Sequence, residues 1–181
     1  MHPFEANNYG ELLAHVDAAA SPHEKGERFE SLCEYLLGTL AGVEVQERDA
    51  DMTAEEIDLV LWNAQVEDVL KPWDFVITVE CKNWASAVGV PQLDSFIAKL
   101  RRRSLKHGIL IAANGVTGAY ENGGGQQGGG AVEIIRAALQ EGIRVITLTM
   151  DDLRGIQSTD DLRSLIKRRY CGLFVHKLLN T

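Results

Sequence analysis

The sequence has 181 residues, of which 45% are hydrophobic and 24% are charged, and its formal net charge at pH 7 is −8. These values fit one globular domain with an ample core and exclude a disordered chain. No run approaches the roughly 20 apolar residues of a membrane span, and the N-terminus lacks the pattern of a signal peptide, so we expect a cytoplasmic protein without a membrane partner. The negative charge argues against nucleic acid as a partner, unless basic residues gather locally.

The first half of the chain predicts two helices and then three strands. Residues 1–23 are expected to form a helical extension. A second helix is predicted over residues 24–40, because apolar residues there recur at helical spacing on one face: Phe29, Leu32, Cys33, Leu36, Leu37 and Leu40. Strands are predicted at 43–48, 56–63 and 74–82, and short connections between them indicate an antiparallel meander.

The second half alternates between helices and strands. A helix opening at 89–91 is followed by a strand at 108–113, a helix at 131–141 and a strand at 143–148. This alternation implies right-handed crossovers and parallel strands. We therefore predict an α/β fold with a mixed central sheet flanked by helices on both faces.

This fold is expected to form a single domain over residues 1–181, with its core at about 24–153 and a helical tail at 158–181. The glycine-rich segment 122–130 does not end in the Lys-Ser or Lys-Thr of a phosphate-cradling loop. We interpret it as a flexible loop.

Three polar residues at the ends of two predicted strands form the main candidate site. Glu80 and Lys82 share one face of their strand because side chains alternate. If Asp58 lies opposite Glu80, the same antiparallel register pairs Trp62 with Val76. Asp58, Glu80 and Lys82 would then gather on one face, at one end of the hairpin.

Such a cluster suits the hydrolysis of a phosphodiester. Two neighbouring carboxylates repel each other unless a cation lies between them, and hard oxygen ligands suit Mg²⁺, for which Mn²⁺ can substitute. The metal polarises a phosphoryl oxygen and lowers the pKa of a bound water, and the ammonium of Lys82 offsets the charge that builds on the phosphate. The alternative is an exposed cross-strand ion pair with no catalytic role. In the catalytic interpretation the charges are expected to be exposed as well, so Glu80→Ala and Lys82→Ala should each abolish cleavage and leave the melting temperature nearly unchanged.

Two further polar residues and one aromatic residue are weaker candidates. Glu30 lies at the flank of the apolar helix face, where it either reaches towards a metal or is an ordinary solvated charge. Gln92 stands in the first turn of the following helix, where it either contacts phosphate or is simply a polar surface residue. Trp84 follows the Glu-x-Lys triplet, where it either stacks on a base or packs at a boundary.

These motifs, in this order, resemble the PD-(D/E)XK nuclease superfamily, and most closely its Mrr-like, type IV restriction endonuclease branch. The resemblance covers about Lys25 to Leu153 and rests on stretches that include Gly26–Glu30, Ile57–Val60 and Val79–Lys82. It implies that Asp58, Glu80 and Glu30 are metal ligands and that Lys82 is catalytic. A second likeness is to nuclease modules at the front of large restriction helicases.

The chain departs from the Mrr-like pattern in two places. Many members have Gly-Gly or Thr-Gly before the Ile-Asp, where this chain has Glu55-Glu56, and these two negative charges put metal affinity or substrate approach in doubt. The helix after the Thr-x-x-Ala stretch is interrupted by the glycine-rich segment, which suggests a mobile element beside the cleft.

Positive charge is concentrated in two segments. Lys99, Arg102 and Lys106 are expected to face solvent on and after the helix that follows the catalytic strand, and to contact the DNA backbone. The alternative is an ordinary solvated face. A second basic run, 167–169, lies in the tail.

The sequence therefore predicts a metal-dependent endodeoxyribonuclease, acting in restriction or anti-phage defence. A Holliday-junction or repair nuclease is the alternative within the same chemistry, and a non-catalytic DNA-binding or assembly module is the alternative of another class. DNA is the expected partner, together with a second copy of the chain or a helicase or defence complex that it joins as a subunit.

Overall fold

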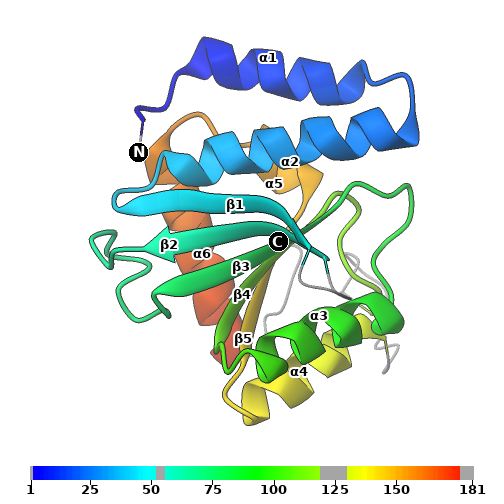
Figure 1. The fold of residues 1–181 in the computed structure, drawn as a ribbon, viewed down its shortest axis with the longest axis vertical. Coiled ribbons are helices and arrows are strands. Elements are labelled where there is room, and N and C mark those ends of the chain that lie inside the picture. The colour runs from blue at the N-terminus through cyan, green and yellow to red at the C-terminus, as the bar shows by residue number, and fades with distance from the viewer. Residues whose placement is uncertain (1, 52–55, 119–129, 176–181) are drawn as a thin grey trace.

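The computed structural model describes residues 2–51, 56–118 and 130–175 (Figure 1). Its helices are α1 (Ala6–Asp17), α2 (Pro22–Gly38), α3 (Val90–Arg102), α4 (Ala131–Gln140), α5 (Met150–Arg154) and α6 (Thr159–Phe174). Its strands are β1 (Val43–Asp51), β2 (Glu56–Asn63), β3 (Val76–Lys82), β4 (His107–Ala112) and β5 (Arg144–Leu148). Apart from Gly130, the predicted flexible loop at 122–130 lies outside the described residues, as do the last six residues of the predicted tail.

The five strands form one mixed sheet in the order β1-β2-β3-β4-β5. The first three strands are antiparallel neighbours, whereas β3, β4 and β5 run parallel. This arrangement confirms the predicted meander followed by parallel crossovers. The predicted register is also confirmed, because Trp62 pairs with Val76 and Leu59 pairs with Val79.

Helices pack on both faces of the sheet, as predicted. The α2 helix contacts β1, β2 and β3, and α6 contacts β5, while α3 packs beside α4; Figure 1 shows α6 passing behind the strands. Close packing of α3 depends on Gly108 of β4, because a Cβ atom there would lie 2.9 Å from Leu100 and from Phe96. Every residue of the apolar strand β4 is buried, so this strand lies in the middle of the molecule with both of its faces covered.

Local signals explain where two of the helices begin. Pro22 occupies the first turn of α2, and the Ser21 hydroxyl accepts a hydrogen bond from the backbone N–H of Glu24 at 3.2 Å. The short helix α5, which the sequence analysis did not predict, begins with a reciprocal cap between Thr149 and Asp152. None of the described helices is long and apolar enough to cross a membrane.

Candidate active site

The candidate site lies where β2 and β3 part. Their backbone pairing ends at Leu59 and Val79, one residue short of Asp58 and Glu80. Beyond that point the Asp58 side chain replaces the backbone of β2 as the partner of β3, because its Oδ2 accepts a hydrogen bond from the backbone N–H of Cys81 at 2.5 Å. The β3 strand continues its pairing with β4 as far as Lys82. Asp58 is therefore anchored to β3 by its side chain, at an end of the hairpin where the two backbones separate.

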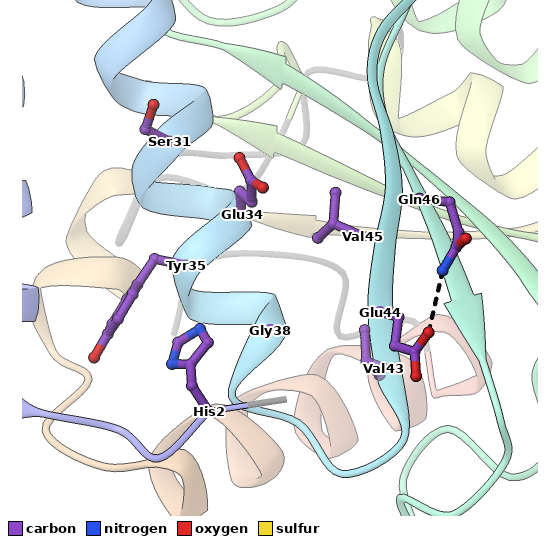
Figure 2. A pocket seen from close by; sticks show the side chains of 9 residues that line it. All are labelled: His2, Ser31, Glu34, Tyr35, Gly38, Val43, Glu44, Val45 and Gln46. Atoms are coloured by element: carbon purple, nitrogen blue, oxygen red, sulfur yellow. Dashed lines mark hydrogen bonds between the residues drawn. The ribbon is translucent and has the colours of Figure 1, made fainter.

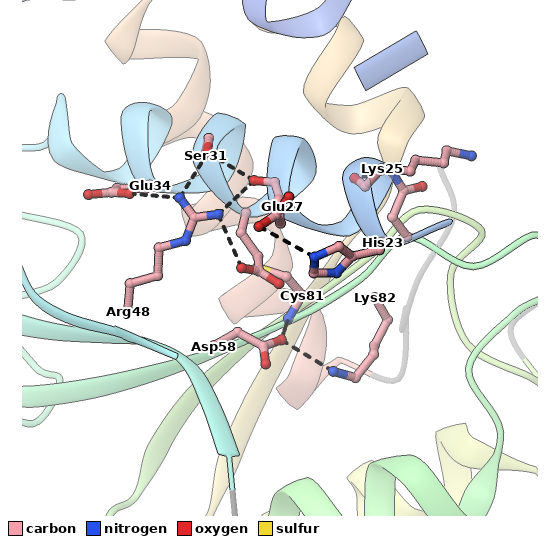
Figure 3. Close-up of polar contacts among 11 residues, drawn as sticks. His23, Lys25, Glu27, Ser31, Glu34, Arg48, Asp58, Cys81 and Lys82 are labelled. Carbon is pink, nitrogen blue, oxygen red and sulfur yellow. Dashed lines mark hydrogen bonds and ion pairs between the residues drawn. The ribbon is translucent and has the colours of Figure 1, made fainter. Parts of the chain in front are cut away.

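One lysine joins the two carboxylates. The Lys82 Nζ lies 3.2 Å from Asp58 Oδ2 and 2.9 Å from Glu80 Oε1, and Figure 3 shows Lys82 directed towards Asp58. The structure thus brings together all three residues of the predicted cluster. Their side chains are only 7%, 10% and 20% exposed for Asp58, Glu80 and Lys82, so the expectation of an exposed ion pair is wrong.

Burial and mutual charge perturb the protonation of this cluster. Burial raises the pKa of Asp58, and the neighbouring Glu80 carboxylate raises it further, against the opposing effect of Lys82. Burial lowers the pKa of Lys82, but Glu80 and Asp58 outweigh that effect and raise the pKa above its ordinary value. Lys82 therefore stays charged near neutral pH, while the two carboxylates repel each other at close range.

A second lysine enters the cluster from α3. Lys99 Nζ lies 2.9 Å from Glu80 Oε2, and its side chain is 11% exposed. The prediction that Lys99 faces solvent is therefore wrong. The physical reason is helical spacing: Lys99 is three residues after Phe96, and residues three apart are neighbours on a helix surface. Because Phe96 is buried, its neighbour Lys99 is carried onto the sheet and meets Glu80.

Glu30 takes part in a different group of contacts. Arg48 of β1 lies 3.3 Å from the Glu30 carboxylate and donates hydrogen bonds to Ser31 Oγ and to the Glu27 carbonyl (Figure 3). Arg48 lies opposite Leu59, so it is on the sheet face of Cys81 rather than that of Glu80. Among the described residues, no three Asp, Glu, His or Cys side chains come together as a ready metal site.

The face of β3 away from the cluster is core. As predicted from strand alternation, Cys81 points to the side opposite Glu80, where it is buried beside Cys33 of α2. A hydrogen bond with Cys33 and burial both raise the pKa of the Cys81 thiol. The three cysteines, Cys33, Cys81 and Cys171, are free thiols.

A comparison with known families identifies the family to which this chain belongs. The sequence model of the Mrr catalytic domain, described as a restriction endonuclease, matches residues 23–141. This match covers most of the chain and includes Asp58, Glu80, Lys82 and Lys99. The chain belongs to the Mrr-type restriction endonuclease family.

Other comparisons add little to this assignment of the Mrr-type chain. No curated protein matches its sequence significantly. Among solved structures, SfsA of Pyrococcus furiosus in complex with Ca²⁺ is similar, with 19% sequence identity and a TM-score of 0.38. That match covers 72% of this chain and 58% of the SfsA chain. The TM-score is too low to support a conclusion about fold or function.

The structure of the Mrr-type nuclease separates the predicted DNA-contacting residues. Gln92 is exposed in the first turn of α3, and Arg102 and Lys106 are exposed at and after its end. Lys106 directly precedes β4. Continuing the parallel β3–β4 register back from Thr78 and Gly108 places Lys106 beside Val76, which is four residues before Glu80 on β3. It therefore lies roughly 13 Å along the strand from the cluster of Asp58, Glu80 and Lys82. Trp84 is 42% exposed just beyond β3.

The basic run in the tail is not uniformly exposed. Lys167 and Arg168 face solvent on α6, but Arg169 is buried and donates hydrogen bonds of 2.7 Å to both carboxylate oxygens of Asp152. Arg169 thus fixes α6 to the start of α5. Only two residues of this run are presented to solvent.

A hollow lies between α2 and β1 of the Mrr-type chain. It has a volume of about 560 Å³, and its lining includes His2, Tyr35, Glu34 and Val45 (Figure 2). None of the predicted site residues lines it.

Proposed function

We propose that this Mrr-type chain is a Mg²⁺-dependent endodeoxyribonuclease that hydrolyses DNA phosphodiester bonds in defence against foreign DNA. The observation that carries the proposal is the pair of buried carboxylates, Asp58 and Glu80, bridged by the single ammonium of Lys82. Family membership supports a nuclease of restriction endonuclease type. The metal requirement, the DNA substrate and the role in defence are parts of the proposal.

The donor set fits a hard divalent cation. Mg²⁺ keeps several of its waters and is held by one or two carboxylates together with substrate phosphates, so Asp58 and Glu80 are sufficient protein ligands. The mutual repulsion that contributes to the raised pKa of Asp58 would be relieved by a cation between them. Glu30 is a weaker ligand candidate, because Arg48 already pairs with its carboxylate.

Each residue of the cluster has a distinct task in the proposed reaction. A bound Mg²⁺ would supply the polarisation of the phosphoryl oxygen and a water of lowered pKa. Asp58 is fixed by the Cys81 N–H and presents its carboxylate at a constant place. Lys82 keeps its proton, so it acts as a cation that stabilises the negative charge growing on the phosphate, rather than as a base.

Phosphate contacts are proposed for the exposed side chains on the α3 side of the sheet. Arg102 and Lys106 would hold the DNA backbone at a distance from the cluster, and Gln92 would contact it near the start of α3. The acidic total of the chain makes such local contacts necessary.

The proposal is tested by incubating the purified chain with supercoiled plasmid and with linear duplex DNA. We expect nicked or linear products with Mg²⁺ or Mn²⁺ and intact DNA with EDTA. The variant Lys82→Met, purified in parallel, controls for contaminating nucleases. Undiminished cleavage in EDTA would contradict the metal requirement. DNA that is bound but never cut with either metal would favour the non-catalytic DNA-binding module instead.

A further inference from the structure

The two carboxylate oxygens of Glu80 are held by different lysines. Lys82, from the same strand, lies 2.9 Å from Oε1, and Lys99, from α3, lies 2.9 Å from Oε2. Both lysine side chains are largely buried. Glu80 is therefore fixed from two elements at once, in the orientation in which it faces Asp58.

Burying the ammonium of Lys99 costs free energy, and this cost calls for an explanation. Taking an ammonium out of water costs several kcal/mol unless a partner compensates. Its neighbours Phe96 and Leu100 are fully buried, so an apolar side chain would pack at this position without that cost. Lys82 alone already joins the two carboxylates, so the second ammonium is not needed to keep them from separating.

The charges of the four side chains cancel. Asp58 and Glu80 supply two negative charges, and Lys82 and Lys99 supply two positive charges. From these four side chains alone, a divalent cation gains little net attraction, and it must compete with an ammonium for Glu80. A DNA phosphate adds negative charge to the same place and shifts the balance in favour of the cation.

We propose that Lys99 is a positioning residue that holds Glu80 and keeps the affinity of the carboxylate pair for divalent metal low until DNA is bound. This inference rests on the proposed function. Lys99 thereby couples metal binding to DNA binding: the two ligands strengthen each other because both act on the same charges. Without the Lys99 ammonium, the carboxylates bind metal in the absence of DNA.

The test measures Mn²⁺ binding to the full chain without DNA, from the loss of the free-ion signal in electron paramagnetic resonance. The variant Lys99→Met keeps most of the side-chain volume and removes the charge. We expect it to bind Mn²⁺ at least about tenfold more tightly than the wild type, because a unit positive charge close to the metal is lost. Lys99→Arg keeps the positive charge, so its Mn²⁺ binding should stay as weak as that of the wild type.

Lys71→Met is the matched control. Lys71 pairs with Asp68 on the exposed connection between β2 and β3, so the same chemical change there should leave Mn²⁺ affinity as in the wild type. If Lys99→Met does not fold, Lys99→Gln provides the same loss of charge with a polar side chain. Melting curves of each variant establish that the folded protein is being measured.

Three outcomes would overturn the inference. Equal Mn²⁺ affinity in wild type and folded Lys99→Met or Lys99→Gln would show that Lys99 does not regulate metal binding. If Lys99→Met binds Mn²⁺ like the wild type, but its slope of log DNA affinity against log salt concentration is less steep by about 0.9, then Lys99 contacts a DNA phosphate instead. A wild type that does not cleave DNA, together with no Mn²⁺ binding by either the wild type or Lys99→Met, would defeat the proposed function and this inference together, whereas cleavage with equal affinities defeats the inference alone.

Discussion

Removing the Glu80 carboxylate should destabilise the protein substantially. In Glu80→Ala, Lys99 loses the carboxylate at 2.9 Å from its ammonium, while Lys82 keeps Asp58 at 3.2 Å. Breaking a buried ion pair by removing one partner costs about 3–5 kcal/mol. Because Lys82 keeps its contact with Asp58 and the Asp58–Glu80 repulsion is relieved, we expect the lower end, about 3 kcal/mol. For a chain of this size that corresponds to a fall in melting temperature of roughly 6–12 °C.

The assay is thermal unfolding followed by circular dichroism at neutral pH in EDTA. Glu141→Ala is the matched control, because Glu141 pairs with Arg101 through side chains that are half exposed. An exposed pair contributes up to about 1 kcal/mol, so this control should lose no more than about 4 °C. The double variant Glu80→Ala with Lys99→Met should be more stable than Glu80→Ala alone, since the buried ammonium that faced Glu80 is gone. The reasoning is refuted if Glu80→Ala melts no lower than Glu141→Ala, or if the second substitution recovers nothing.

Three further predictions concern other parts of the molecule. Burial lowers the pKa of His107 despite the opposing effect of Asp74, so as pH falls the imidazole is protonated in the unfolded chain before it is protonated in the folded protein. The contribution of His107 to stability should therefore be full above pH 6.5 and fall as pH drops below that value. Melting curves of His107→Gln should show a smaller loss of stability over the same pH range. Changing both Arg102 and Lys106 to Glu should make the salt dependence of DNA binding less steep by up to about 1.8, measured by fluorescence anisotropy, whereas the same change at Lys167 and Arg168 should have less effect; the reverse order would place the DNA on α6. Gly108→Ala should cost about 1–3 kcal/mol in denaturant unfolding, because its Cβ meets Leu100 and Phe96 at 2.9 Å; a neutral result would mean that α3 is free to shift.

The pairing of β2 with β3 could be predicted from the sequence because successive side chains of a strand point to opposite faces. Pairing Asp58 with Glu80 fixes the same register as pairing Trp62 with Val76, and the structure has that register. The sequence could not reveal that the backbone pairing stops before Asp58 and that the Asp58 side chain replaces it at the Cys81 N–H. That feature depends on how two strands diverge in space, which no local pattern records.

The errors at the site have a common cause, which is the assumption that charged side chains face water. The sequence predicts Lys99 on the solvent side and Glu80 in an exposed cluster, although both are buried. The spacing of three between Phe96 and Lys99 was a usable signal for the first. The helix α5 was missed because five residues are too few to establish a helical period, although Thr149 and Asp152 stand at the spacing of a reciprocal cap.

The central claim is that Asp58, Glu80 and Lys82 form a catalytic centre, and cleavage by Lys82→Met tests it most directly. Plasmid cleavage with Mg²⁺ should be measured beside DNA binding in EDTA, for wild type, Lys82→Met and the remote control Lys71→Met. The account predicts that Lys82→Met folds and binds DNA but loses at least about 10²–10³-fold in cleavage rate, while Lys71→Met cleaves like the wild type. Cleavage by folded Lys82→Met at the wild-type rate would contradict the account.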